Sequence, residues 1–94
     1  MTWTIEYTPK VFKAFKKDLD RQVVRRMIAK LEEAATLEDP TTMAKPLTGN
    51  LRGLWSYRIG GGYRVIVDVQ QDRLVILALA AGPRRDIYDG STPW

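Results

Sequence analysis

The residues best suited to chemistry are three arginines, Arg58, Arg64 and Arg84, which a small β-sheet would gather on one face beside Tyr88. Arg58 and Arg64 flank the segment Ile59-Gly-Gly-Gly-Tyr63, which is typical of a β-hairpin with a three-residue loop. That loop pairs its two flanking residues and places Arg58 opposite Arg64, about 5 Å apart at Cβ, where like charges repel. Because guanidinium groups match phosphate oxygens in shape and charge, the pattern predicts a site for a phosphodiester.

The chain contains no histidine and no cysteine. The usual acid–base group at neutral pH, which is also the commonest metal ligand, is therefore missing, as are disulfides and thiolate chemistry. We expect no metal and no other cofactor at the site. Proton transfer would have to use tyrosine, lysine, arginine, carboxylates or the substrate itself.

The formal net charge of +4 and the pI near 9.6 indicate an acidic partner. Lysines concentrate in residues 10–30, whereas every cation from Arg52 onward is an arginine. Lysines on a helix usually form a solvated face, and arginines on strands more often bind a planar group. Arg52 and Arg73 fit the description of ordinary surface charges best.

At 94 residues, 45% hydrophobic and 28% charged, the chain is expected to form one small soluble domain spanning residues 1–94. No apolar run approaches the length of a membrane span, and no signal-peptide pattern is present at the start. We therefore expect a cytoplasmic protein that does not associate with a membrane.

Alternation of apolar and polar residues over residues 2–8 predicts a first strand. Thr8 followed by Pro9 is typical of a helix start, and Asp20 is suited to cap a second helix. Together the two helices form an αα-hairpin. Its expected core residues are Val11, Phe12, Phe15, Leu19, Val23, Val24, Met27, Ile28, Leu31 and Ala35.

Residues 36–50 lack a periodic pattern and are expected to form a loop, followed by strands near 54–59, 63–69 and 73–80. The predicted fold is α+β: an N-terminal strand, the αα-hairpin and a three-stranded antiparallel meander in one sheet, with the helices on one face. Strict alternation turns Trp55, Tyr57, Ile59, Tyr63, Val65, Val67, Val75, Leu77 and Leu79 toward the helices. It turns Ser56, Arg58, Arg64, Ile66, Ile76, Ala78, Ala80 and Arg84 to the other face, which the small alanines should make concave.

Two motifs resemble those of the RelE/ParE toxin superfamily. They are Leu47-Thr-Gly-Asn-Leu-Arg-Gly-Leu-Trp-Ser-Tyr-Arg-Ile-Gly-Gly-Gly-Tyr-Arg-Val-Ile66 and Gly82-Pro-Arg-Arg-Asp-Ile-Tyr88. The similarity covers essentially the whole chain, and the motif ending in Tyr88 is more similar to the RelE branch. It implies a RelE-like, microbial ribonuclease-type fold.

The resemblance also implies a toxin of a type II toxin–antitoxin system. Such a protein is a metal-independent endoribonuclease, an mRNA interferase that cuts the codon in the ribosomal A site through attack of a ribose 2′-OH on the adjacent phosphate. Its partners would be the ribosome, mRNA and a cognate acidic antitoxin, which neutralises it in a toxin–antitoxin hetero-oligomer.

By the same resemblance, Arg64 would hold the scissile phosphate and Arg84 would stabilise the transition state or assist the leaving group. Tyr88 would stack on a base or help proton transfer, although a tyrosine packed on the sheet fits the sequence equally well. Arg58 would contact RNA. Arg85 is either a phosphate contact or the ion-pair partner of a nearby aspartate.

Lys13 and Lys17 are expected RNA contacts, although a solvated helix face would show the same pattern. The chain departs from many members at two places, with Pro83 in place of a histidine and Ser56 in place of a second cation. Two alternatives therefore stay open. One is a ParE-like inhibitor of DNA gyrase without nuclease activity, and the other is an inactive remnant that only binds an antitoxin.

Overall fold

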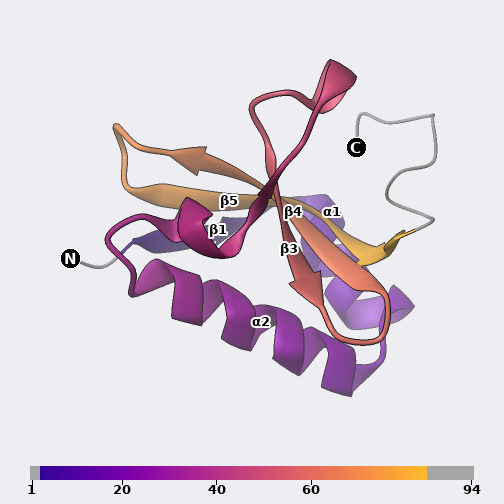
Figure 1. Ribbon diagram of the computed structural model, residues 1–94. Helices are drawn as coiled ribbons and strands as arrows, with labels where there is room; N and C mark the ends of the chain where they lie inside the picture. Colours follow the sequence, from indigo (N-terminus) through magenta and orange to yellow (C-terminus); the bar gives the residue numbers. More distant parts are fainter. Residues whose placement is uncertain (1–2, 85–94) are drawn as a thin grey trace.

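The computed structural model describes residues 3–84, which form a five-stranded sheet in the order β1-β5-β4-β3-β2 (Figure 1). The strands are β1 (Thr4–Tyr7), β2 (Lys45–Pro46), β3 (Trp55–Ile59), β4 (Tyr63–Gln70) and β5 (Val75–Pro83). β1 runs parallel to β5, and every other neighbouring pair is antiparallel. The predicted meander is therefore confirmed as β3, β4 and β5.

The two expected helices are present and their caps are the predicted residues. α1 (Pro9–Lys13) continues into a π-helical turn over Ala14–Asp18, and α2 covers Arg21–Ala35. The Val11 N–H donates to Thr8 Oγ1 at 3.3 Å, and the Gln22 N–H donates to Asp20 Oδ1 at 2.7 Å. None of the helices in residues 3–84 combines the length and apolar character needed to cross a bilayer.

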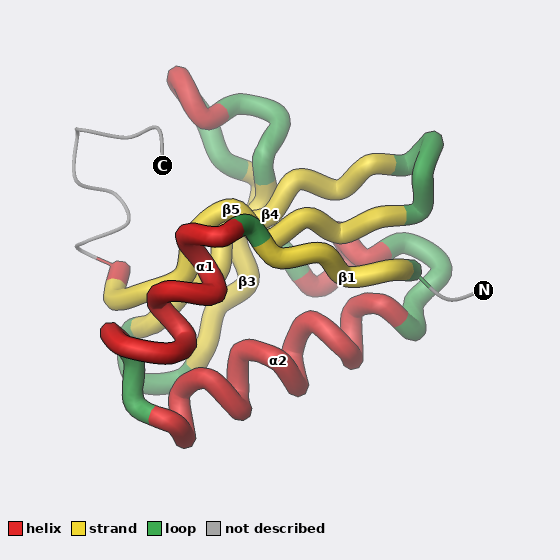
Figure 2. The backbone as a smooth tube through the Cα atoms, turned by 180° about the vertical axis from the view of Figure 1, so that it is seen from behind, coloured by secondary structure: helices red, strands yellow, loops and turns green. Residues whose placement is uncertain are grey.

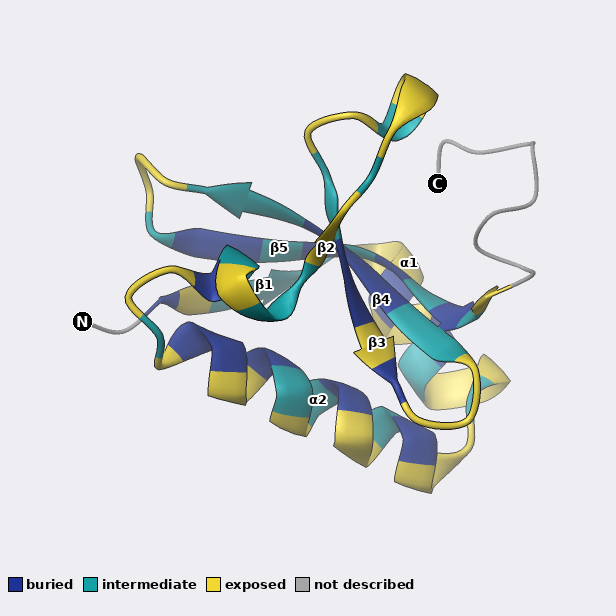
Figure 3. Ribbon diagram, viewed as in Figure 1, coloured by how far each residue is buried: buried dark blue, intermediate teal, exposed yellow. Residues whose placement is uncertain are grey.

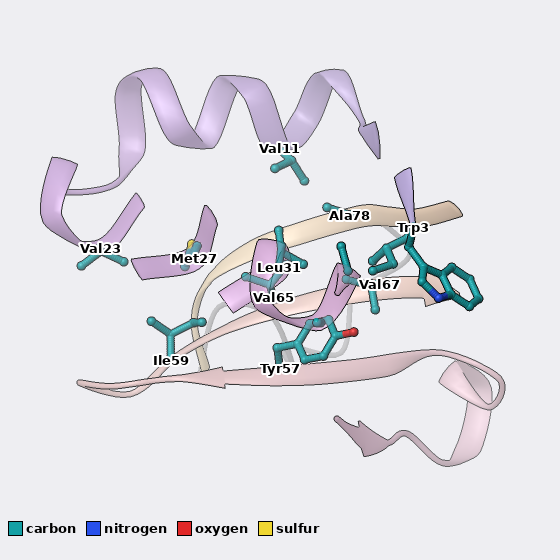
Figure 4. Packing of buried hydrophobic residues seen from close by; sticks show 13 residues of the cluster. Trp3, Val11, Val23, Met27, Leu31, Tyr57, Ile59, Val65, Val67 and Ala78 are labelled. Carbon is teal, nitrogen blue, oxygen red and sulfur yellow. The ribbon is translucent and has the colours of Figure 1, made fainter. Parts of the chain in front are cut away.

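Both helices pack on the same face of the sheet, so the core forms between two layers (Figures 2 and 4). Val11 from α1 and Met27 and Leu31 from α2 are fully buried against Tyr57 and Val65. The buried stripe of α2 faces the sheet while its outer side is exposed (Figure 3).

Phe12 corrects the predicted core, because its side chain is 52% exposed. A helix turns by about 100° per residue, and the inward positions here belong to Val11 in α1 and Ala14 at the start of the π-helical turn. The Phe12 ring lies beside them, 5.6 Å from the ring centroid of Tyr7. Phe12 is thus a surface aromatic residue.

A β-bulge in β5 overturns part of the predicted face assignment. Ile66 pairs with Ala80 but Val67 pairs with Ala78, which leaves Leu79 as the extra residue. Strict alternation placed Ile76 and Ala78 on the face opposite the helices, and both instead belong to the main core. Beyond the bulge the alternation reverses, so Ala80 lies with Ile66 in a second, smaller cluster on the opposite face.

The segment predicted as a loop contains a short edge strand, β2, that the sequence pattern did not indicate. A 3₁₀ turn over Pro40–Met43 precedes it, capped by Asp39, which accepts from the Thr41 N–H at 3.0 Å. Tyr57 is fully buried and donates its hydroxyl to the Pro40 carbonyl at 3.0 Å. This hydrogen bond attaches the turn that leads into β2 to the middle of β3.

Replacing Tyr57 with phenylalanine removes the hydroxyl donor and leaves the buried Pro40 carbonyl without this hydrogen bond. We expect the free energy of unfolding at pH 7 to fall by about 1–3 kcal/mol, measured by urea denaturation. Equal stability of Tyr57→Phe and the wild type would show that the hydrogen bond is not needed to hold the turn.

The same residue should make stability depend on alkaline pH. Burial, aided by the nearby Asp39 charge, raises the pKa of Tyr57 to about 12, above its ordinary value of 10.0. The unfolded chain loses this proton first, so the contribution is complete below pH 10 and falls as pH rises toward 12, by about 2–3 kcal/mol in total. Urea denaturation from pH 9 upward should show a shallower decline for Tyr57→Phe than for the wild type. Parallel declines would assign the effect to other groups.

Candidate functional site

The glycine hairpin has the predicted register. Arg58 pairs with Arg64, and Ile59 pairs with Tyr63 across the Gly60–Gly62 turn. Paired residues of antiparallel strands project from the same face. Tyr57 and Val65, the adjacent pair, are buried against the helices, so both arginines lie on the face opposite the helices.

Arg84 reaches the same place from the end of β5. Its backbone N–H donates to the Gly62 carbonyl at 2.9 Å, which fixes it beside the hairpin turn. Gly82 pairs with Arg64, and Pro83 pairs with Tyr63. The predicted meeting of Arg58, Arg64 and Arg84 is therefore present in the structure, and the bulge at Leu79 is what sets the face of Arg84.

These cations line two adjoining hollows with volumes of about 470 Å³ and about 220 Å³. Lys45, Arg64 and Arg84 line both hollows, and Arg58 lines only the larger one. Within residues 3–84, no carboxylate belongs to either lining. The larger volume lies within the ~300–1,000 Å³ usual for small-ligand pockets, which leaves room for a phosphate and its attached sugar.

Lys45 is the site residue that the sequence pattern missed. It is an exposed residue of β2 and pairs with Ser56 of β3. Arg58 follows Ser56 by two residues in β3, so both side chains project from the same face of the sheet. A strand of two residues is too short to show an alternating pattern. The sequence therefore showed no sign that Lys45 would lie beside the arginines.

The other predicted contacts lie elsewhere or are not described. Lys13 and Lys17 line a separate, mainly apolar hollow around Phe12 on the helix layer. Arg85 and Tyr88 lie outside the described residues. Arg73 forms an exposed ion pair with Glu6, 3.7 Å between Nη2 and Oε2, in agreement with its expected role as a surface charge.

The arrangement suits the binding of a diester anion. Arg58 and Arg84 are exposed and Arg64 is half-buried. Strand pairing fixes the backbone of Arg58 and Arg64, and the hydrogen bond to Gly62 fixes the backbone of Arg84. Guanidinium forks can hold two phosphate oxygens at once, while the lysine supplies a mobile point charge. Four cations on one concave surface would favour the extra negative charge that a pentavalent phosphorus transition state develops.

Comparison with known proteins gives a consistent result. Residues 5–88 match the family model for the ParE toxin of the type II toxin–antitoxin system parDE. No curated protein sequence matches the chain significantly.

Several solved structures share the fold. A mutant of the E. coli toxin RelE in the free state has a TM-score of 0.74 at 19% identity, covering 94% of this chain and 92% of that one. The toxin–antitoxin complex RelBE2 from Mycobacterium tuberculosis gives 0.72 at 20% identity, covering 89% and 100%. The archaeal RelE–RelB complex from Pyrococcus horikoshii OT3 gives 0.66 at 26% identity, covering 98% and 100%.

The glycine turn that positions the arginines should tolerate a side chain at one residue and not at the next. Gly61 has φ +85°, where an added Cβ costs about 1–2 kcal/mol. A Cβ at Gly60 would meet only Arg26 Nη1, at 3.8 Å, and no left-handed backbone is required there. We expect Gly61→Ala to lower the free energy of unfolding by that amount and Gly60→Ala to change it little, in urea denaturation. Equal losses in the two variants would contradict this explanation.

Proposed function

Since the chain belongs to the RelE/ParE superfamily, whose members are toxins of type II toxin–antitoxin systems, we propose that it is a ribosome-dependent mRNA interferase. The observation that carries this proposal is the cationic surface formed by Lys45, Arg58, Arg64 and Arg84. A hollow of about 470 Å³ lined by four cations is suited to a phosphate and its attached sugar. The substrate would be mRNA in the ribosomal A site.

The proposed reaction uses the nucleophile that RNA itself contains. The ribose 2′-oxygen attacks the adjacent phosphorus and loses its proton, while the bond from phosphorus to the 5′-oxygen breaks and that oxygen gains a proton. The products are a 2′,3′-cyclic phosphate and a 5′-hydroxyl. The protein then has to hold in-line geometry and neutralise charge on the phosphate.

Arg64 and Arg84 are suited to electrostatic stabilisation, because a guanidinium stays charged in proteins and has no basic atom ready to accept a proton. We assign Arg64 to the scissile phosphate and Arg84 to the charge that develops on the leaving oxygen. Arg58 would bind an RNA phosphate beside them. Tyr88 is assigned to base stacking or proton transfer and Arg85 to a phosphate, both on the resemblance of the motif that contains them.

A second function is favoured by one observation, the match to the ParE model. ParE-like toxins inhibit DNA gyrase by binding it and carry no nuclease site. In that case the arginines would not act as one unit, and toxicity would come with DNA damage and without mRNA cleavage. The appearance of new mRNA ends therefore distinguishes the nuclease from the gyrase inhibitor.

The partner of this toxin is proposed to be an acidic antitoxin encoded beside it. Structures of similar fold include complexes with RelB. Phe12 is the large hydrophobic side chain that is exposed within residues 3–84, and its hollow is rimmed by Lys13, Lys16 and Lys17. An amphipathic acidic segment would bury the ring and pair with these lysines. The predicted RNA contacts of Lys13 and Lys17 lie on this same surface.

Removing either central guanidinium should abolish most of the cleavage. We expect Arg64→Ala and Arg84→Ala each to lower the rate by about 10²–10³, the usual effect of losing one preorganised charge-stabilising donor. The measurement is a cell-free translation reaction with purified protein, in which primer extension maps new mRNA ends with and without ribosomes.

The matched control is Arg73→Ala, which removes the same charge at an exposed ion pair with Glu6. This variant should cleave like the wild type. Ribosome-dependent ends inside codons, lost with Arg64→Ala and kept with Arg73→Ala, would support the nuclease. Intact mRNA together with inhibited gyrase supercoiling would overturn it in favour of the second function.

Truncating Phe12 should weaken antitoxin binding and leave cleavage unchanged. Burying an aromatic ring contributes about 1.5–3 kcal/mol, so Phe12→Ala should raise the Kd of the co-encoded antitoxin by about 10- to 100-fold, measured by calorimetry. Phe12→Leu keeps an apolar side chain and should retain most of the affinity. An unchanged Kd for Phe12→Ala would exclude this surface.

A further inference from the structure

Lys45 lies beside the three arginines but belongs to β2, a strand that is outside both motifs of the toxin superfamily. β2 contains only Lys45 and Pro46, paired with Ser56 and Trp55 of β3. The ladder continues by one hydrogen bond, from the Leu47 N–H to the Leu54 carbonyl at 3.0 Å. Because paired residues share a face, Lys45 lies on the same face as Ser56, which is the face of Arg58 and Arg64.

The neighbours of Lys45 in the chain confirm this orientation. Leu47, two residues further along, packs with Leu54 on Ile66 and Ala80, the small cluster on the face opposite the helices. Residues two apart on an extended segment project to the same side. Lys45 and Leu47 therefore project together, with the leucine packed on the sheet and the lysine next to the arginines.

The segment before Lys45 is held at several points, so the lysine is not on a free loop. Asp39 accepts from the Thr41 N–H at 3.0 Å and from its hydroxyl at 2.7 Å, and Tyr57 donates to the Pro40 carbonyl at 3.0 Å. Pro46 adds a fixed φ directly after the lysine. A backbone fixed in this way positions the Cα of Lys45, while the four-carbon side chain keeps its freedom to reach.

Lys45 lines both hollows together with Arg64 and Arg84. We propose that Lys45 is a substrate-contacting residue, which binds the phosphodiester from the β2 side while the two arginines bind it from β4 and the end of β5. This proposal rests on the proposed nuclease function, for which it adds a fourth cation. The two arginines approach the phosphate from β4 and from the end of β5. The ammonium of Lys45 adds a positive charge from a third side, that of β2.

Three variants test the proposal: Lys45→Met, Lys45→Arg and, as the matched control, Lys10→Met. Lys10 is also exposed, lies in α1 on the helix layer, and loses the same unit of charge when replaced. In the translation reaction we expect Lys45→Met to cleave about 10- to 100-fold more slowly, a smaller loss than for a central guanidinium. Lys45→Arg should stay within a few-fold of wild type, and Lys10→Met should match it. Thermal unfolding of all three should be unchanged.

A binding measurement separates failure of this proposal from failure of the nuclease function. The probe is a short single-stranded RNA with 2′-O-methyl riboses, which cannot be cleaved. A plot of log K against log salt should lose about 0.7 of slope in Lys45→Met, the value for one phosphate contact on a single strand, and none in Lys10→Met.

Each outcome decides the matter. Full cleavage by Lys45→Met, alongside inactive Arg64→Ala, would overturn the role of Lys45 and leave the nuclease intact. If the wild type cleaves no mRNA, the proposed nuclease function is wrong. The salt dependence of RNA binding still tests whether Lys45 contacts a phosphate. An unchanged slope in Lys45→Met, or no RNA binding by the wild type, would overturn the proposal.

Discussion

The cationic surface depends on one irregularity of the backbone, the bulge at Leu79. β1 ends at Tyr7, which pairs with Ala78, and the next residue, Thr8, donates its N–H to the Ala78 carbonyl at 3.2 Å and its hydroxyl to the Leu79 carbonyl at 3.5 Å. Because β1 ends at this point, β5 can accommodate one extra residue there without disrupting its pairing with β1. Without that residue, Arg84 would share the face of Ile76 and Ala78 and point toward the helices.

The core on one face of the sheet positions the charges on the other. Along β3, Tyr57 and Ile59 are buried against the helices, with Arg58 between them. A slip of one residue in the register would bury guanidiniums and expose these apolar groups, so the packing energy of the core strongly disfavours it. The hydrogen bond from Tyr57 to the Pro40 carbonyl also fixes the turn that leads into β2, and it thereby helps to position Lys45.

The two surfaces proposed for partners lie on different layers of the molecule. RNA would bind the open face of the sheet, whereas the exposed Phe12 and its lysines lie on the helix layer. An antitoxin that covered only Phe12 would leave the arginine hollow open. To neutralise the proposed nuclease, an antitoxin would extend from one layer to the other or keep the protein from binding the ribosome. An extended acidic segment suits the first route, because it can cover a long, discontinuous and positively charged path.

Spacing within a few residues was enough to predict the order of the two helices and the other four strands, the caps at Thr8 and Asp20 and the opposition of Arg58 and Arg64. It also placed Arg84 on the correct face, although by an alternation that the bulge breaks. The bulge, the strand β2, the place of Lys45 and the exposure of Phe12 became visible only in the folded chain. These features come from contacts between distant segments, such as the hydrogen bond of Thr8 to Leu79 across 71 positions, which no local pattern encodes.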